Sequence, residues 1–412
     1  MLVALVAAAG MTASAQSPVK ITLDEAVKLA LEHNHALRAT RTLIEQSQAQ
    51  EVTANLRPNP VITADAQFLP FDPNNWNSNT IDQTSQFDIG LIYLFERGRK
   101  RQNRLQAARD LTAVQRSLVS DAERALTFSV AQQFVGALLA ESNLQFALAD
   151  LNSFQNTVDI SEARYKAGDI SEGDFLKIKL QLLQFQTDVS AARLAKVQAL
   201  VTLRELLGYE SVPADYDVAG DLAYQSLAKN AEDLQAMALQ LRPDLRAAQQ
   251  GVTASQSLFS LAKANGKRDV TGQINYSHVG GISGASFFVN VQLPIFDRNQ
   301  GEIARTRYAI TQSQETATAV SETVVGDVKG AYEGVKANDQ VVQLYRSGYL
   351  DQAQQSRDIS EYSYKRGAAS LLDFLDAERS YRATQLAYRQ SLANYMLALE
   401  QLREAVGTRN LP

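Results

Sequence analysis

The spacing of hydrophobic positions changes from helical to strand-like and back, and the chain runs through this order twice. Apolar residues recur at helical intervals over residues 23–54 and again over 231–265, so each half is expected to begin with an amphipathic helix. Two runs that alternate apolar and polar residues follow each helix, and such alternation predicts strands. The four expected strands cover about residues 60–69, 86–95, 270–279 and 286–295.

Each run is about ten residues long, the length that a tilted strand needs to cross a bilayer. One face of these strands is rich in aromatic and aliphatic side chains and is expected to meet lipid. The other face is polar and is expected to line water; its residues are Asp65, Gln67, Asp88, Gln273, Asn275, Asn290 and Gln292. Alternation alone also fits a soluble sheet packed on helices, and this alternative stays open.

Very long helical patterns follow the strands. Residues 99–167 and 302–366 contain no proline, and at 1.5 Å per residue each would span on the order of 100 Å. Each pattern reverses at a Tyr-Lys-x-Gly sequence and returns as a helix, over 174–207 and 373–406. A glycine follows each return helix as a C-terminal cap. The pattern therefore predicts two antiparallel, coiled-coil-like helical hairpins.

The second half of the chain repeats the first. Residues 161–208 align without a gap to residues 360–407 at a constant shift of 199 (360 − 161 = 199). The repeat is too long for a solenoid unit, so it indicates a duplicated half-molecule. We therefore expect two repeats, 16–208 with its tip at about 165–174, and 209–412 with its tip at about 364–373.

Residues 1–15 form a short apolar run that ends in Ala13-Ser14-Ala15, although the usual positive charges before it are missing. This run predicts a signal peptide cleaved before Gln16, and hence an exported protein. No later stretch approaches about 18 consecutive apolar residues, so no transmembrane helix is expected.

Four membrane-length strands cannot close a barrel, and an open sheet edge is not tolerated in lipid. Several copies of the chain must then complete one barrel, and three copies would supply twelve strands. The expected fold is mainly α, with long antiparallel helices forming an α-barrel and four transmembrane strands per chain. A homotrimer closes the twelve-stranded β-barrel.

Composition excludes several functions. The net charge is −5, which gives no basic field for nucleic acid, and the chain has no cysteine for disulfides, thiolate metal sites or nucleophiles. A glycine-rich phosphate loop and a catalytic Ser-His-Asp spacing are also missing from the sequence. We expect neither an enzyme nor a cofactor. A periplasmic coiled-coil scaffold or adaptor is the remaining alternative from another class.

Two motifs carry a resemblance to a known family. The pattern Tyr-x-x-Gly-x-x-Ser-x-x-Asp-Phe-Leu occurs in both tips, within residues 164–176 and 363–375. The sequence LPIFDRNQGEIARTR, residues 293–307, stands where a strand passes into a long helix, and YLFERGRKRQNR, residues 93–104, is its weaker counterpart. With these motifs the whole mature chain resembles the outer-membrane efflux protein family, of which TolC is the type member.

The resemblance implies a trimeric conduit, with a twelve-stranded barrel in the outer membrane and a helical tunnel through the periplasm. It implies docking on a periplasmic adaptor and an inner-membrane pump, without chemistry of its own. The form of residues 293–305 is most similar to the branch that serves cobalt–zinc–cadmium exporters of the RND type. A multidrug or type I protein-secretion outlet is the alternative within the family.

The reversal of each hairpin needs a residue that accepts a positive φ angle, which explains Gly168 and Gly367. The family resemblance adds that these tips meet the hairpin tips of the adaptor. The expected adaptor-contact residues are Gly168, Ser171, Asp174, Gly367 and Ser370.

Aspartates in the first helical turn after each tip have a structural explanation, because the positive end of the helix dipole favours acidic side chains there. In the second repeat Asp373 and Asp376 share one helix face, and the resemblance implies that they narrow and charge the periplasmic entrance as two rings of carboxylates. The first repeat carries Lys177 at the equivalent place, so the rings are not doubled.

Tyr165 and Tyr364 are either packing aromatics or parts of a gate. In the type member a tyrosine here latches the closed tip through an arginine five residues later, but this chain has Ile170 and Ala369 at those places. The latch is therefore absent or rewired. The candidates for a substitute are Arg164, Lys365 and Arg366.

Histidines are few and offer no ligand pattern. His33 and His35 do not face each other on a helix, and His278 is alone in a strand. We expect no dedicated metal site in this chain, so selectivity for a metal cargo would lie in the pump.

Overall fold

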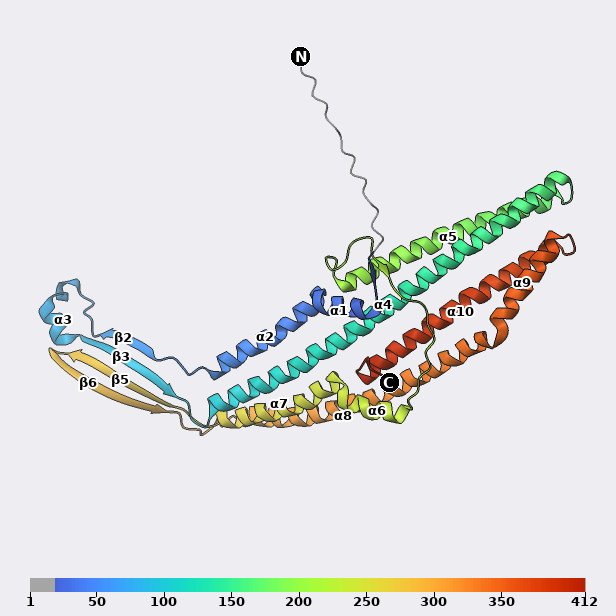
Figure 1. The fold of residues 1–412 in the computed structure, drawn as a ribbon. Helices are drawn as coiled ribbons and strands as arrows, with labels where there is room; N and C mark the ends of the chain where they lie inside the picture. Colours follow the sequence, from blue (N-terminus) through green and yellow to red (C-terminus); the bar gives the residue numbers. More distant parts are fainter. Residues whose placement is uncertain (1–18, 412) are drawn as a thin grey trace, which may run out of the picture. The chain divides into compact units, whose positions relative to one another are not determined.

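The computed structural model describes residues 19–411; the expected signal peptide lies outside them. The chain is mainly helical, with one four-stranded sheet (Figure 1). It divides into two compact units, and each unit combines segments from both halves of the sequence. The first unit comprises residues 19–38, 123–234 and 328–411, and the second comprises 39–122 and 235–327.

The second unit contains all four strands expected from the alternation. The sheet is antiparallel in the order β2-β3-β5-β6. These strands are β2 (Val61–Gln67), β3 (Gln86–Phe95), β5 (Val270–Val279) and β6 (Ile282–Val291).

The strand register separates an apolar face from a polar face, as the alternation predicts. Leu91 lies opposite Ile62 on one side and Ile274 on the other, and all three side chains are exposed. On the opposite face Asp65 pairs with Asp88. An apolar face left open to the surroundings is the feature of the sheet that needs an explanation, because buried apolar surface is what normally stabilises a sheet.

Two boundaries around the sheet differ from the sequence expectation. Strand β6 begins at Ile282 rather than near residue 286, because Gly280 and Gly281 form a two-residue turn with φ angles of 55° and 76°. The strand then stops before Pro294, which lacks the N–H for a further ladder bond. The long loop expected between the first two strands holds two short helices, η1 (Pro73–Asn75) and α3 (Ser78–Thr84).

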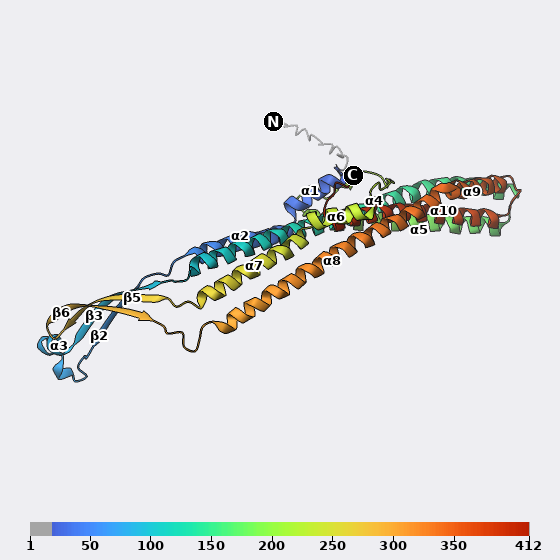
Figure 2. The same cartoon turned by 90° about the horizontal axis from the view of Figure 1, so that it is seen from below.

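The helices of the second unit are tied together by side-chain hydrogen bonds. These helices are most of α2 (His35–Asn55), α7 (Pro243–Asn265) and the first parts of α4 (Lys100–Ala167) and α8 (Gln300–Leu344). Ser117 of α4 donates to Gln250 of α7 over 2.7 Å, and the hydroxyls of Ser255 and Ser313 join α7 to α8. Figure 2 shows these helices running side by side.

The first helix of each half is broken, which corrects the expectation of one continuous helix. Helix α1 (Leu23–His33) ends before Asn34, whose side chain accepts the N–H of Leu37 at the start of α2 and donates to the Leu206 carbonyl. Helix α6 (Ala231–Leu241) ends before Arg242, because Pro243 cannot donate a helical hydrogen bond. The two breaks are equivalent in the repeat (242 − 34 = 208), the shift that aligns these helices.

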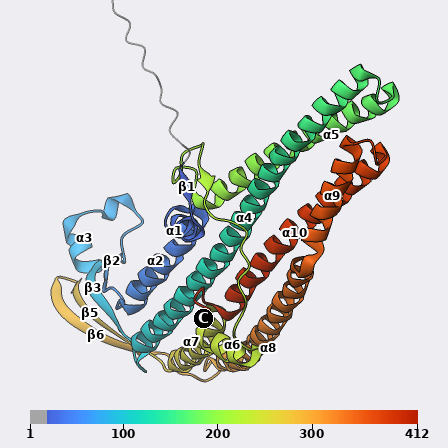
Figure 3. The same ribbon diagram turned by 45° about the vertical axis from the view of Figure 1, so that its right-hand side comes forward.

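The first unit holds two helical hairpins (Figure 3). A tight turn connects the second part of α4 to α5 (Glu172–Leu207), and another connects α9 (Leu350–Lys365) to α10 (Leu371–Val406). A two-residue parallel bridge between β1 (Lys20–Ile21) and β4 (Asp217–Val218) joins the start of the chain to the segment after α5.

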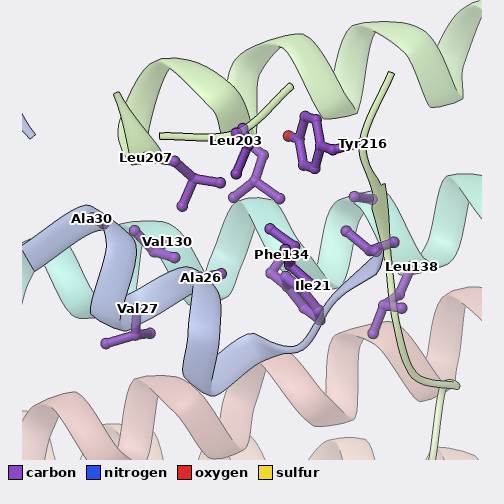
Figure 4. Close-up of a cluster of buried hydrophobic side chains, with 13 residues drawn as sticks. Ile21, Ala26, Val27, Ala30, Val130, Phe134, Leu138, Leu203, Leu207 and Tyr216 are labelled. Carbon is purple, nitrogen blue, oxygen red and sulfur yellow. The ribbon is translucent and has the colours of Figure 1, made fainter. Parts of the chain in front are cut away.

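A buried cluster fixes α1 and this bridge to the base of the first hairpin (Figure 4). Val130, Phe134 and Leu138 of α4 pack against Leu203 and Leu207 of α5. Removal of such side chains from water is the main source of stability. The small residues Ala26 and Ala30 of α1, both fully buried, allow that helix to approach closely.

The second long pattern is not one rod. Helix α8 ends at Leu344, a π-helical segment η2 covers Tyr345–Tyr349, and α9 continues from Leu350. Gly348 has a φ angle of 121°, which side chains rarely adopt, so a single non-helical residue interrupts the rod. Helical periodicity did not reveal the break because the flanking residues keep their helical spacing.

Within residues 19–411, no helix combines the length and apolar character needed to pass through a membrane.

The interruption at Gly348 can be tested by substitution. A Cβ at Gly348 meets nothing closer than 3.9 Å, so Gly348→Ala should destabilise the protein through backbone strain alone, by about 1–2 kcal/mol. The matched control is Gly334→Ala in the regular part of α8, which also has open space and should be neutral or stabilising by up to about 1 kcal/mol. Thermal unfolding of the detergent-solubilised variants measures both changes. Equal effects of the two substitutions would contradict the assigned backbone of Gly348.

Candidate functional site

The two hairpin tips are built by the same local chemistry. Gly168 and Gly367 have φ angles of 84° and 74°, and their N–H groups donate to the carbonyls of Tyr165 and Tyr364 over 3.0 Å. Both glycines are exposed. The turn explanation for these glycines therefore has a direct geometric basis.

A serine begins the return helix at each tip. Ser171 accepts the N–H of Asp174 over 3.1 Å, and Ser370 accepts that of Asp373 over 3.2 Å. At the second tip the carboxylate of Asp373 also accepts the backbone N–H of Ser370 over 3.3 Å, which completes a capping box. The two serines and the Asp373 carboxylate thus satisfy backbone N–H groups that the helix leaves unpaired.

The acidic side chains of the second tip remain exposed. Asp373 and Asp376 lie one helical turn apart, and Asp376 contacts Arg379 at 3.2 Å, with both of these side chains largely in solvent. At the first tip Lys177 contacts Asp174 at 3.3 Å. At these equivalent positions the second tip thus has two carboxylates, of which Asp376 pairs with Arg379, and the first tip has one carboxylate, Asp174, paired with Lys177.

The two tyrosines at the tips have different surroundings. Tyr364 is buried and stacks on Phe374 at a ring-centroid distance of 5.5 Å, whereas Tyr165 is partly exposed and stacks on Phe175 at 5.0 Å. Tyr364 belongs to an aromatic cluster that joins the two hairpins, whose other large members include Phe154. Stacked aromatic rings add to the stability that their burial provides.

Among the candidate latch residues, Arg164 bridges the two hairpins. Its guanidinium donates to the Tyr364 carbonyl over 2.8 Å and lies 5.5 Å from the centre of the Tyr364 ring. Arg366 stacks on Tyr362, a neighbour in its own hairpin, and Lys365 pairs with Glu361 at 2.6 Å, also within its hairpin. The contact of Arg164 is therefore the one that depends on the relative position of the hairpins.

A buried charged cluster next to these aromatics was missed by sequence reasoning. Arg382 of α10 forms ion pairs with Asp150 of α4, at 2.7 Å, and with Asp188 of α5. Glu378, one turn before Arg382, is only 5% exposed and hydrogen-bonds to Asp150, which is 6% exposed. The cluster thus links α10 to both helices of the other hairpin. Its members are far apart in the sequence, and only their tertiary proximity reveals it.

Burial and the neighbouring Asp150 carboxylate raise the pKa of Glu378 to about 8, against the opposing effect of Arg357 and Arg382. Burial also raises the pKa of Asp150. Two carboxyl groups in contact cannot both ionise without repulsion, so we expect the pair to hold one proton near neutral pH. The hydrogen bond between Asp150 and Glu378 depends on that proton.

The stability of the protein should depend on the Glu378 proton. The pKa of this group is raised on folding, so its contribution is fully present at low pH and is lost as pH rises from about 4.5 to about 8. The limiting slope for one proton is about 1.4 kcal/mol per pH unit. Glu378→Gln, which keeps the hydrogen-bonding shape of the neutral acid, should flatten this dependence and stabilise the protein above neutral pH.

Chemical unfolding of the detergent-solubilised protein between about pH 5 and pH 9 measures this effect. The matched control is Glu333→Gln, which alters an exposed glutamate of α8 and should leave the pH dependence as it is. An unchanged pH slope in Glu378→Gln would show that Glu378 does not carry the proton.

In residues 19–411 no group of three histidine, aspartate or glutamate side chains is arranged to hold a metal ion. His278 instead contacts the carboxylate of Asp82 at 3.0 Å, and His33 lies at the end of α1. The tips therefore offer exposed turns and exposed charged side chains to a binding partner.

Comparison with known proteins agrees with this architecture. The family model described as outer membrane efflux protein matches residues 26–209 and 234–408. The cobalt-zinc-cadmium resistance protein CzcC of Cupriavidus metallidurans is 23% identical over 377 residues, which cover 89% of this chain and 85% of that protein. The toluene efflux pump outer membrane protein TtgI of Pseudomonas putida is 25% identical over 407 residues, which cover 92% of this chain and 83% of that protein.

The fold is also similar to solved structures. A crystal structure of CusC, from work on its folding and transmembrane channel formation, matches with a TM-score of 0.76. The match covers 95% of this chain and 93% of that chain at 19% sequence identity, so it bears on the fold alone.

Proposed function

The chain belongs to the outer membrane efflux protein family, and from this premise we propose that three copies assemble into one conduit through the outer membrane and the periplasm. The protein is an efflux component of the outer membrane and a transport protein rather than an enzyme. The trimer, the partners, the site residues and the cargo are the parts that we propose.

The observation that carries the proposal is the sheet with two unpaired edges. Within residues 19–411, β2 pairs only with β3 and β6 only with β5, while the large side chains of one face are exposed. Lipid satisfies the apolar face but leaves backbone groups at an open edge without partners. Pairing of β6 with β2 of the next copy removes both edges, and three copies give a closed barrel of about twelve strands.

Helix α5 offers a second reason for assembly. Large apolar side chains remain exposed along it at intervals that fit a heptad repeat, which is the spacing of a coiled-coil seam. They are Leu176, Leu180, Leu183, Leu194, Val197 and Val201. A helix of a neighbouring copy would cover this seam, so the helical hairpins would close into a cylinder as the strands close into a barrel.

We propose that the exposed tips bind a periplasmic adaptor, which connects the conduit to an inner-membrane pump of the RND type. The support is the pair of similar exposed turns, which offer repeated small residues for close approach of another hairpin. The residues proposed for this contact are Gly168, Ser171, Asp174, Gly367 and Ser370.

The periplasmic entrance is proposed to be lined by Asp373 and Asp376. Both carboxylates are exposed, and threefold symmetry would repeat each of them in a ring, which attracts cations and repels anions. Arg164, with Tyr364 beneath it, is proposed to hold the hairpins in the closed arrangement. Tyr165 and Arg366 make contacts within their own hairpins, so any part they have in gating would be indirect.

Conductance in a planar bilayer tests the conduit and its entrance together. The wild-type trimer should conduct and prefer cations, and Asp373→Asn/Asp376→Asn should lose most of that preference because the ring charge is removed. Glu232→Gln, at an exposed position at the start of α6, is the control and should keep it. If the trimer keeps its cation selectivity in the Asp373/Asp376 variant, these residues do not charge the entrance. A protein that neither trimerises nor conducts would refute the conduit.

The same recordings test the proposed latch. Arg164→Ala removes the bridge between hairpins and should raise the open probability, whereas Arg366→Ala should leave it unchanged because its contact stays within one hairpin. Identical open probabilities in Arg164→Ala and the wild type would rule Arg164 out as a latch.

The proposed cargo is heavy-metal cations. The support is the similarity to a cobalt-zinc-cadmium resistance protein and the form of residues 293–305. A comparable identity to a toluene efflux protein keeps organic solutes or secreted proteins as the alternative. The wide polar interior expected of the conduit does not select between them.

Deletion of the gene in its own host should lower tolerance to zinc, cobalt or cadmium salts, and plasmid-borne wild-type protein should restore it. Tolerance to toluene and to common antibiotics, measured on the same plates, should not change. Loss of solvent or antibiotic tolerance with normal metal tolerance would overturn the metal proposal and leave the conduit intact.

A further inference from the structure

Three arginines whose side chains have no carboxylate partner lie where the sheet passes into the helices of the second unit. Among the described residues no carboxylate is within salt-bridge distance of their side chains. These junction arginines are Arg57, Arg99 and Arg101, whereas the backbone N–H of nearby Arg97 donates to Asp269 over 2.9 Å. In a protein of net charge −5, a local excess of positive charge needs an explanation.

The neighbouring cations have structural partners. Lys100 contacts Asp269 at 2.7 Å, and Arg104 contacts Glu96 at 2.8 Å while it also donates to the Ala54 carbonyl over 2.9 Å. These ion pairs fix the junction between strand and helix. The junction arginines take no part in them, so their charge is available to a ligand.

Two of the junction arginines line a cavity of about 300 Å³. Arg57 and Arg101 lie in its wall together with the rings of Tyr93 and Phe95. Its one carboxylate, Glu96, is held by Arg104. The cavity thus offers two free guanidinium groups, which match the oxygens of a phosphate, beside apolar surface.

Strands β3, β5 and β6 all meet their helices at the same end of the sheet (Figure 1), and exposed apolar side chains lie there. The register places Phe95 beside Val270 and Val270 beside Val291, and the segment after Val291 carries Leu293 and Phe296, which are 75% and 90% exposed. Water disfavours such exposure, whereas the boundary between headgroups and acyl chains accepts both aromatic and basic side chains. A free phosphate ion would leave this apolar surface uncovered.

We propose that the junction arginines, with Phe95 and the segment 293–296, form a binding site for anionic phospholipid in the leaflet at the helical end of the sheet. The guanidinium groups bind the headgroup phosphate, and the exposed apolar side chains contact the first carbons of the acyl chains. This inference rests on the proposed function, because it requires the sheet to lie in a membrane.

The test titrates the purified trimer in detergent with phosphatidylglycerol, and measures bound lipid by native mass spectrometry and by thermal stabilisation. Phosphatidylcholine and inorganic phosphate are separate arms. We expect phosphatidylglycerol to bind most tightly, and Arg57→Gln/Arg101→Gln to weaken it about 10- to 30-fold, the effect of two surface charges. Arg116→Gln/Arg307→Gln removes the same charge from exposed arginines elsewhere in the unit and should bind as the wild type does.

The oligomeric state of each variant in lipid-free detergent is measured first. This distinguishes a loss of lipid binding from a failure to form the trimer. A double variant that forms the trimer and binds phosphatidylglycerol like the wild type would overturn the proposal. So would inorganic phosphate that binds as tightly as the lipid, because the apolar segment would then contribute nothing. A third outcome would also overturn the proposal. If the trimer dissociates only in Arg57→Gln/Arg101→Gln, and the trimers that remain bind lipid as the wild type does, the arginines contact the neighbouring copy rather than lipid.

Discussion

Every backbone N–H and C=O group that faces lipid needs a hydrogen-bond partner within the protein, and a sheet of four strands leaves two edges without one. This constraint explains why a chain with an exposed apolar sheet face is incomplete as a single copy. The two halves contribute equally to the fold, since each provides one pair of strands and one helical hairpin. The closure by symmetry that we propose would satisfy the backbone and would turn the polar face, with Asp65 opposite Asp88, towards the inside.

The helical part depends on a different balance. The two hairpins of one chain are held together by stacked aromatic rings and by the ion pairs of Arg382 with Asp150 and Asp188. Buried ion pairs add little net stability compared with apolar packing, but they strongly disfavour arrangements that leave one charge unpaired. The cluster therefore specifies the relative position of the hairpins more than it strengthens their association. Because burial and the Asp150 carboxylate raise the pKa of Glu378, we expect the stability of this arrangement to depend on pH.

The junction between strand and helix lies between the part of the sheet proposed to meet lipid and the helices proposed to lie in the periplasm. Its ion pairs, such as Lys100 with Asp269, connect parts of the chain that are distant in sequence, whereas the junction arginines have no carboxylate partner and Phe296 is exposed. Equivalent positions in the two repeats use similar backbone solutions here, because Arg99 and Asn299 both have positive φ angles immediately before their long helices. The two repeats thus share the same backbone conformation before the long helix, although the residues that adopt it differ.

The sequence by itself determined the elements that depend on near neighbours along the chain. Period-two alternation located the four strands, and the Tyr-Lys-x-Gly sequences located the tips, because both signals come from local backbone preferences. The tertiary structure decided what depends on distant residues. The break at Asn34 needs the Leu206 carbonyl, the bridge of Arg164 needs Tyr364, and the charged cluster joins Asp150 to Glu378 across more than half the chain. The interruption at Gly348 likewise escaped the helical pattern, because glycine is compatible with a helix and with a left-handed backbone, and only the packed structure selects between them.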